Sequence, residues 1–273
     1  NRIQSFDRVR ATVDALLAAG IRGVNFDLMY GLPYQTTSML LRTVEASLAL
    51  FPDRIALFGY AHVPWMARNQ RLLPGEALPG AAERFEQAEA AGALLEERGY
   101  VRIGLDHFAR PEDPMAQAAA DGTLKRSFQG YTVDAAEGLI GLGTTAISTL
   151  PQGYAQNLPE TRGWSRALAE GRLPVHRGIA LSAEDRLRHA VIERLMCDLG
   201  VDAAAVARAH GFRSHHFAAV YGRLQELVEA GLVHLEGTRI TVPEAARPAL
   251  RIVASVFDAY LAPEQPGRHS VAI

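Results

Sequence analysis

Along about the first hundred residues, helical stretches with apolar positions three or four apart alternate with shorter stretches that are almost wholly apolar. Ser5 is a suitable N-cap for the first helix, and Gly20 is a suitable residue to end it. Two further helices are predicted at 37–50 and 81–98, and strands are predicted at 22–30, 54–63 and 100–105. Alternation of this kind indicates crossover units and a parallel sheet, so the expected fold class is α/β.

The pattern changes between Asp106 and about Val175, where glycine and proline become frequent and helical periodicity is weak. A long irregular stretch inside a compact domain is usually functional or disordered, and the aromatic residues here favour a functional one. Beyond it, the periodicity predicts helices at 182–199, 202–210, 214–230 and 244–260, and strands at 232–235 and 239–242. The first three of these helices and the two strands resemble a winged helix-turn-helix. We therefore expect two domains, 1–175 and a mainly helical 176–273, with a frayed tail from Pro263.

Composition narrows the classes of function. The 273 residues carry a net charge of −2, which gives no electrostatic basis for binding nucleic acid. No run approaches the roughly 18 apolar residues of a membrane span, and there is no signal peptide, so a cytoplasmic protein is expected. The one cysteine, Cys197, excludes an intrachain disulfide and cannot supply the several thiolates that a [4Fe–4S] cluster needs.

The start of the chain suggests a processed protein or a fragment. Its first residue is Asn1 rather than methionine, and its first unit begins with a helix rather than a strand. We therefore expect the second half of a sheet, whose leading strand lacks a neighbour and invites self-association.

The sharpest local feature is the segment Asn25–Pro33, in which Asp27 interrupts an apolar parallel strand. A carboxylate there is costly unless it is paired or meets a polar ligand, and ligands sit at the carboxyl ends of such strands. Asp27 is suited to hold ribose hydroxyls, although capping of the following loop explains its position equally well. The next strand ends in Tyr60–Pro64, where His62 is either a ligand or a hydrogen-bonded structural histidine.

Two later motifs, 106–113 and 124–132, combine cationic and amide side chains with aromatic residues. This combination suits a flat ligand with several carboxylates, although a solvated loop explains any single residue as well. Other signals are absent: the glycines of 138–143 lack a nucleotide-binding spacing, and no metal-binding histidine motif or serine elbow occurs. The predicted recognition helix carries Glu226 and Glu229, which do not suit a phosphate-binding surface.

In order along the chain, several blocks resemble the oxygen-independent coproporphyrinogen III oxidase (dehydrogenase) family of radical-SAM enzymes. These blocks are Asn1–Gln4, Phe26–Pro33, Gly59–His62, Gly104–Pro111, Phe128–Thr132, Ala146–Ser148 and Gly153–Asn157. Single blocks are modestly specific, whereas DHFARP and FQGYT in sequence are strongly so. The resemblance implies the later βα units of a partial (βα)6 barrel with a C-terminal helical domain over its mouth. The family's C-x3-C-x2-C cluster motif is not in this chain.

The resemblance also implies roles for particular residues. Arg2, Asp27 and Ala61 match contacts to S-adenosylmethionine, and Ile147 matches a residue that lines a second bound S-adenosylmethionine. Phe128 and Gln129 match positions beside the active centre. The substrate propionates need cationic partners, for which the candidates are Arg110, Lys125, Arg126 and Arg177.

The activity implied is the oxidative decarboxylation of two propionates of coproporphyrinogen III to vinyl groups, giving protoporphyrinogen IX in haem synthesis. A 5′-deoxyadenosyl radical removes a hydrogen from each propionate, and carbon dioxide and an electron then leave. The implied cofactors are S-adenosylmethionine and, in the intact protein, a [4Fe–4S] cluster; the partners are an electron donor and an electron acceptor, and a monomer is expected. This chain alone is expected to have no turnover. Two alternatives are a related haem- or porphyrin-binding chaperone and, less favoured, a winged-helix regulator.

Overall fold

The computed structural model describes residues 4–261, so Arg2 lies outside the described residues. Its first part contains α1 (Phe6–Ala18), β1 (Asn25–Tyr30), α2 (Thr37–Leu48), β2 (Arg54–Gly59), two short 3-10 turns η1 (Arg68–Leu72) and η2 (Gly75–Ala77), α3 (Ala81–Glu97), β3 (Val101–Ile103) and β4 (His107–Ala109). The predicted helices and strands of this part are therefore present. Ser5 caps α1 as expected, since its side chain accepts a hydrogen bond from the Arg8 amide.

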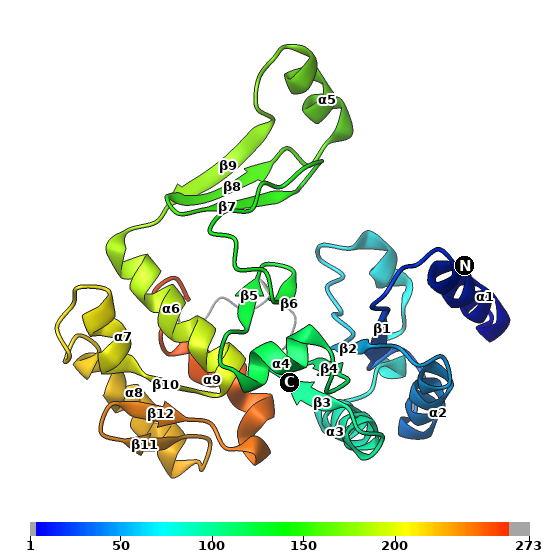
Figure 1. Ribbon diagram of the computed structural model, residues 1–273, viewed down its shortest axis with the longest axis horizontal. Helices are drawn as coiled ribbons and strands as arrows, with labels where there is room; N and C mark the ends of the chain where they lie inside the picture. The colour runs from blue at the N-terminus through cyan, green and yellow to red at the C-terminus, as the bar shows by residue number, and fades with distance from the viewer. Residues whose placement is uncertain (1–3, 262–273) are drawn as a thin grey trace.

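These four strands form one sheet in the order β1-β2-β4-β3 (Figure 1). β1 and β2 are parallel, as expected, but β4 runs antiparallel to both β2 and β3. The expectation of a wholly parallel sheet is thus wrong at this edge. Its physical reason is the three-residue turn Gly104–Asp106, which is far too short for the crossover that a parallel neighbour requires.

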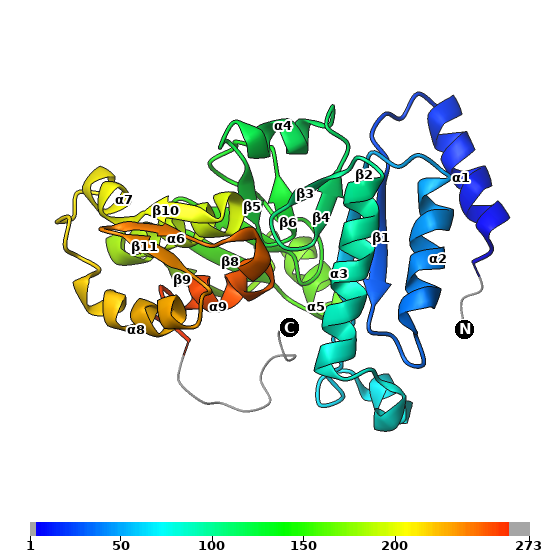
Figure 2. The same cartoon turned by 90° about the horizontal axis from the view of Figure 1, so that it is seen from below.

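One face of this sheet is covered by helices and the other is open at β1. Figure 2 shows α2 and α3 alongside β1. The residues of the covered face share one apolar cluster: Leu40, Val44, Ile55, Leu57, Ala91, Leu95, Tyr100 and Phe108. Along β1 the burial alternates, so that Asn25, Asp27 and Met29 are exposed on the opposite face. We refer to this opposite face as the inner face.

The region 106–175 is more regular than the sequence analysis expected. It contains α4 (Pro114–Ala120), a hairpin of β5 (Lys125–Ser127) and β6 (Gly130–Thr132), β7 (Ile147–Leu150), β8 (Gly153–Asn157) and α5 (Thr161–Ala169). β8 also pairs with β9 (Val175–Ala180), and the three strands form an antiparallel sheet. The prediction failed because these strands are three to six residues long and rich in glycine and polar residues, so they carry little periodicity.

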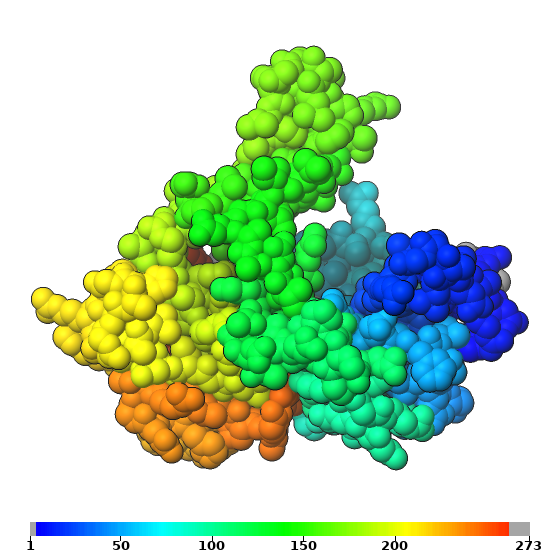
Figure 3. All heavy atoms as spheres, in the orientation of Figure 1, coloured from blue at the N-terminus to red at the C-terminus, as the bar shows by residue number. Residues whose placement is uncertain are grey.

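The sheet β7-β8-β9 and α5 project from the rest of the molecule as an arm (Figure 1). Figure 3 shows open space between this arm and the N-terminal part of the chain. We use the word arm for residues 147–180. Every residue of its last strand, β9, is exposed, whereas in the first strand, β7, only Leu150 is exposed.

The C-terminal part is a separate helical module with a small sheet. It contains α6 (Ala183–Asp198), β10 (Gly200–Asp202), α7 (Ala203–Ala209), α8 (Ala218–Glu229), β11 (His234–Glu236), β12 (Arg239–Thr241), the 3-10 helix η3 (Glu244–Ala249) and α9 (Leu250–Ser255). The expected last helix at 244–260 is interrupted, because Pro248 lies inside it. These elements enclose a core of their own, with fully buried Leu187, Leu195, Leu224 and Phe257. None of the described helices could cross a membrane.

Candidate functional site

The inner face brings the predicted cofactor residue Asp27 into a row that crosses the whole sheet. Asp27 of β1 is opposite Ala56 of β2, Ala56 is opposite His107 of β4, and His107 is opposite Ile103 of β3. Asp27 is exposed, and its Oδ1 accepts a hydrogen bond of 2.8 Å from the side-chain amide of Asn25. Among residues 4–261, its hydrogen-bond donor is Asn25 on the same strand, so the carboxylate does not cap the following loop. The geometry therefore favours the ligand-binding interpretation of Asp27.

Ala61 lies just beyond β2, in a segment that side chains hold in place. The strand ends at Gly59, earlier than predicted, where its partner β1 also ends. Beyond it, Gln70 accepts from the Val63 amide at 2.5 Å and donates to the Ala61 carbonyl at 3.0 Å. Arg84 of α3 donates to the Tyr60 carbonyl at 3.1 Å. These contacts fix the backbone around Ala61 at the carboxyl end of the sheet. Gln70 and Arg84 were not predicted, since nothing in their spacing connects them with Ala61.

Arg84 fits there because two glycines leave room for its guanidinium. A Cβ on Gly31 would lie 3.0 Å from Arg84 Nε, and one on Gly59 would lie 3.0 Å from Arg84 Nη2. Both glycines belong to blocks that carried the family resemblance. The close approach of side chain and backbone explains why glycine suits these positions.

A cavity of about 150 Å³ lies beside this segment, between α3 and the C-terminal module. Its lining includes Tyr30, Ala61, Arg84, Asp106 and Arg251. Burial raises the pKa of Tyr30, partly offset by the positive charges of Arg84 and Arg251. The hydroxyl therefore stays protonated at neutral pH and can donate a hydrogen bond into the cavity.

The side chains of Asp106 and His107 are in contact and form a dyad. The imidazole ring of His107 lies on the inner face. His107 Nδ1 is 2.7 Å from Asp106 Oδ1, and the ring meets the edges of Phe58 and Tyr131. Tyr131 is buried, which raises its pKa to about 12, and its hydroxyl donates to the Met196 carbonyl at 3.0 Å. Both residues belong to the predicted substrate loop, but their mutual contact was not predicted.

Phe128 and Gln129 form the tip of the β5–β6 hairpin. Phe128 is 68% exposed and makes an edge contact with Tyr154 of the arm, at 5.8 Å between ring centroids. Within the arm, Ile147 is opposite Gln156, and Gln156 is opposite Arg177. Ile147 and Arg177 thus share a face of this sheet. The hairpin tip and the arm are in contact, as a common site requires.

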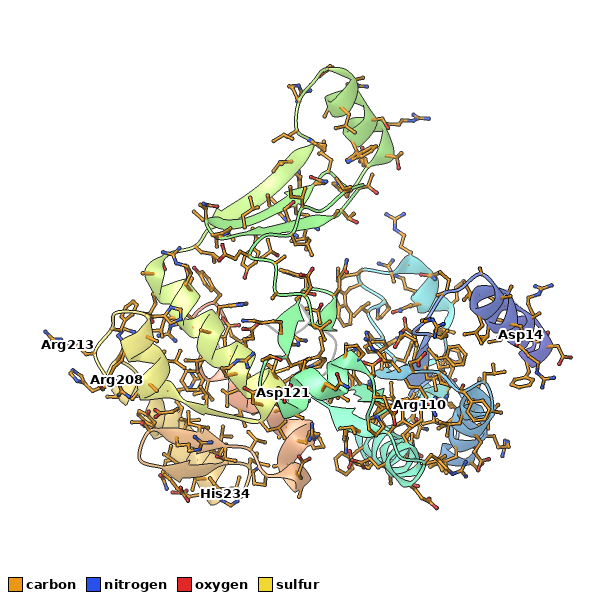
Figure 4. The ribbon with its side chains drawn as sticks, viewed as in Figure 1. Asp14, Arg110, Asp121, Arg208, Arg213 and His234 are labelled. Carbon is orange, nitrogen blue, oxygen red and sulfur yellow. The ribbon has the colours of Figure 1, made fainter. Side chains whose placement is uncertain are left out.

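The four candidate cations differ in their surroundings. Arg110 follows β4 and donates its amide to the Asp53 carbonyl, at the amino end of β2 and therefore opposite the end that carries Ala61. Figure 4 shows Arg110 on the body of the molecule, away from the arm. Lys125 is 3.5 Å from Glu193, and Arg126 lies over the Tyr131 ring. Arg177 is exposed and donates to the neutral amide of Gln156, so it retains its full charge for a ligand.

The residues 4–261 contain no group of three or more histidine, cysteine or acidic side chains that could hold a metal ion. Cys197 is buried, and this burial raises its pKa to about 12, so it is a neutral thiol at physiological pH. With one cysteine, the chain does not supply the thiolates that an iron–sulfur cluster needs.

The class of this α/β fold follows from its likeness to a solved radical-SAM enzyme. The structure of coproporphyrinogen III oxidase (HemN) from Escherichia coli, described as a radical SAM enzyme, is similar to this one. The TM-score is 0.91 and the sequence identity is 34%, over 96% of this chain and 60% of that one. Residues 181–248 match the model of the HemN C-terminal domain.

Curated relatives agree with this match. The oxygen-independent coproporphyrinogen III oxidase of Bradyrhizobium diazoefficiens is 47% identical over 100% of this chain and 60% of its own length. The one from Paracoccus denitrificans is 44% identical over 95% of this chain and 57% of its own length. The chain belongs to this family and corresponds to the C-terminal part of its members, which confirms the resemblance. It spans about three-fifths of the length of these relatives.

Proposed function

We propose that the protein to which this chain belongs oxidises coproporphyrinogen III, converting two propionates to vinyl groups and giving protoporphyrinogen IX. The observation that carries the proposal is the exposed carboxylate of Asp27 on the inner face, at a position that matches the family's cofactor contact. Electron donor and acceptor are partners of the intact enzyme in this proposal. We further propose a cytoplasmic monomer.

The inner face fits S-adenosylmethionine by the chemistry of its residues. Asp27 offers acceptor oxygens for ribose hydroxyls, and the fixed backbone at Ala61 offers amide and carbonyl groups. When bound and cleaved, S-adenosylmethionine supplies the radical that removes hydrogen from a propionate. The cluster needs thiolates that this chain does not contain, so no step is assigned to it here.

The chain's own contribution is to position ligands and to exclude water. Phe128 and Gln129 lie at the hairpin tip, where the exposed ring and amide can contact a tetrapyrrole. Ile147 and Arg177 share one face of the arm, so an apolar surface and a cation face the same side. Among the four cationic candidates, Arg177 is favoured as a propionate partner. It is exposed, whereas Arg110 is at the amino end of β2, Lys125 lies near Glu193, and Arg126 lies over the Tyr131 ring with its Nε buried.

The architecture of the intact protein is part of the same proposal. Residues 4–109 provide the last units of a partial (βα)6 barrel, and the C-terminal module is a winged-helix-like lid. The proposed domains remain 1–175 and 176–273, although β9 begins at Val175 and pairs with β8 across this boundary.

A hybrid enzyme tests the function. The N-terminal two-fifths of the Bradyrhizobium diazoefficiens relative, which this chain does not match, would be joined to the chain at the corresponding position. After anaerobic reconstitution with iron and sulfide, the hybrid is expected to form protoporphyrinogen IX from coproporphyrinogen III, measured by chromatography after oxidation. The unjoined chain should show no turnover. A hybrid that binds haem tightly but never consumes coproporphyrinogen would instead support the chaperone alternative.

A further inference from the structure

His107 lies on the inner face, in the row that contains Asp27. Only Ala56 separates them, so their Cα atoms are two strand spacings, about 10 Å, apart. On its other side, His107 lies against the hairpin: a Cβ on Gly130 would be 3.5 Å from His107 Cε1 and 3.7 Å from its Nε2. Gly130 directly follows Gln129. His107 therefore lies between the proposed cofactor residue and the hairpin tip.

Several contacts fix the orientation of the imidazole. Asp106 Oδ1 is 2.7 Å from Nδ1, and the ring centroid is 5.9 Å from that of Phe58 and 5.3 Å from that of Tyr131. Asp106 is itself held, because its backbone carbonyl accepts from the Leu57 amide at 2.7 Å. The Arg251 guanidinium lies 3.7 Å from Asp106 Oδ2.

The second ring nitrogen is available to a ligand. Among the described residues, no hydrogen bond to His107 Nε2 is found, although the side chain is only 12% exposed. The Asp106 carboxylate can only accept, so the proton on Nδ1 points toward it, and in this tautomer Nε2 presents a lone pair. In this tautomer His107 can accept a hydrogen bond at Nε2.

The surrounding charges favour a donor as its partner. Asp106 contacts the ring, and Asp27 lies farther along the same row, so a ligand carboxylate at Nε2 would meet two negative charges. Of the two cations nearby, Arg251 lies 3.7 Å from Asp106 Oδ2, on the side of the carboxylate away from the ring contact, and Arg126 lies over the Tyr131 ring, 5.6 Å from its centroid. An N–H group fits this environment better than a propionate does.

We propose that His107, oriented by Asp106, is a ligand-binding residue whose Nε2 accepts a hydrogen bond from an N–H group of a bound ligand. This inference rests on the proposed function. Within that function, N–H donors come from the pyrroles of the porphyrinogen or from the amino groups of S-adenosylmethionine. Both are uncharged or cationic donors, and the test below separates them.

Two substitutions separate a ligand contact from a structural one. In His107→Gln, the longer side chain can place its amide oxygen near the position of Nε2. In His107→Asn, the shorter amide can still donate to Asp106 but does not reach the Nε2 position. In the hybrid enzyme, we expect His107→Asn to raise the KM for coproporphyrinogen III or the Kd for S-adenosylmethionine about tenfold, and His107→Gln to change them less than about threefold.

The two measurements identify the donor. A rise in KM alone assigns the contact to a pyrrole N–H, and a rise in the Kd for S-adenosylmethionine alone assigns it to an amino group of the cofactor. Asp106→Asn provides a second route, because an amide that donates to Nδ1 leaves Nε2 protonated and unable to accept. It is expected to weaken the same constant as His107→Asn.

The opposite ranking would overturn the inference. If His107→Asn retains both constants while His107→Gln loses them, the imidazole serves only its contact with Asp106. Wild-type constants in both His107 variants would overturn it as well. A wild-type hybrid that neither binds S-adenosylmethionine nor consumes substrate contradicts the proposed function, and this inference with it.

Discussion

Asp27 has an environment that differs from that of the other carboxylates near the ends of the strands. Asp53 accepts from the Val24 amide, and Asp113 caps α4 and pairs with Arg54, so both are part of the scaffold. Asp27 receives a hydrogen bond from Asn25 and is otherwise exposed on the inner face. Removing its carboxylate should therefore affect binding far more than stability.

In the hybrid enzyme, we expect Asp27→Ala to raise the Kd for S-adenosylmethionine at least about tenfold, because charge-assisted hydrogen bonds to ribose are lost. The thermal unfolding temperature should stay within about 2 °C of wild type, as for an exposed surface position. Equilibrium binding and calorimetry measure the two quantities. Asp14→Ala on the exposed face of α1 (Figure 4) is the matched control and should change neither. An unchanged Kd for Asp27→Ala would remove this residue from the site.

Asp202 is a carboxylate of the opposite kind, with a purely structural role. Its Oδ1 accepts from the amides of Ala204 and Ala205 at the start of α7 and from the Thr238 hydroxyl. The Ala205 amide is the largest cause of a lowered pKa, followed by the Thr238 hydroxyl. The ionised carboxylate of Asp202 is thus more stable in the folded state than in the unfolded state.

Asp202→Ala should lower the free energy of unfolding by about 1 kcal/mol at pH 7, as loss of an N-cap does. Because the folded pKa is lowered, the charge-dependent stabilisation is fully present above the unfolded pKa, about 3.9, and is lost as pH falls through the folded pKa. Asp202→Asn keeps an acceptor but not the charge, so the advantage of wild type over this variant should shrink in acid. Urea unfolding at several pH values measures it. An advantage that does not change with pH would contradict the assignment.

At the scale of single residues, the sequence predicts candidates better than it predicts contacts. Asp27 could be chosen because a carboxylate in an apolar strand is costly and needs an explanation. Gln70 and Arg84 could not be chosen, since their partners around Ala61 are backbone groups 9 and 24 positions away, which no local pattern connects with them. Arg110 was a reasonable cation, but only the antiparallel direction of β4 shows that it lies at the amino end of β2.

At the scale of elements, β1 is an edge strand with one exposed face. It pairs with β2 and forms the edge of the described sheet, while its inner face exposes Asn25, Asp27 and Met29. Met29 is 43% exposed. An edge strand with an exposed apolar side chain can pair with a second copy, so this strand is expected to mediate self-association of the chain on its own.

Sedimentation velocity of the 273-residue chain should therefore show concentration-dependent association. Met29→Lys is expected to weaken this association at least about fivefold, because a charge beside the open edge opposes pairing. Leu142→Lys is the matched control, since Leu142 is 88% exposed and distant from β1 in sequence. A Leu142→Lys variant that dissociates as readily as Met29→Lys would show that exposed apolar side chains in general, rather than β1, cause the association.

Elements with strong periodicity were predicted well, and elements made by non-local pairing were not. α1, α2 and α3 begin within one residue of their predicted starts, since caps and apolar spacing are local signals. β1 begins later than predicted, because Gly23 has φ +89 and the Val24 amide donates to Asp53 instead of to a strand. The arm was missed altogether: its strands are held by partners such as Gln156 and Arg177, which are 21 positions apart.

For the molecule as a whole, the connection between the sheet and the C-terminal module includes a buried arginine. Arg247 of η3 donates from Nη1 to the Gly104 carbonyl at 2.6 Å, in the turn that precedes the Asp106–His107 dyad. Its other nitrogens bind Glu244 at 2.8 and 2.6 Å, and its side chain is 7% exposed. The module and the inner face are therefore mechanically linked through this turn.

Arg247→Met keeps the apolar stem but leaves the Gly104 carbonyl without this donor. Because an unsatisfied buried group costs about 1–3 kcal/mol, the free energy of unfolding should fall by about 2 kcal/mol. Hydrogen exchange measured by mass spectrometry should show faster exchange in 101–109 and in 244–257 than in β1 and β2, as the two parts lose their connection. Glu244→Gln is the control: it removes an ion pair whose acid is 75% exposed while keeping the bond to Gly104, so it should change stability by less than about 1 kcal/mol. Equal effects of both substitutions would mean that the Arg247–Glu244 pair, rather than the bond to Gly104, connects the module to the sheet.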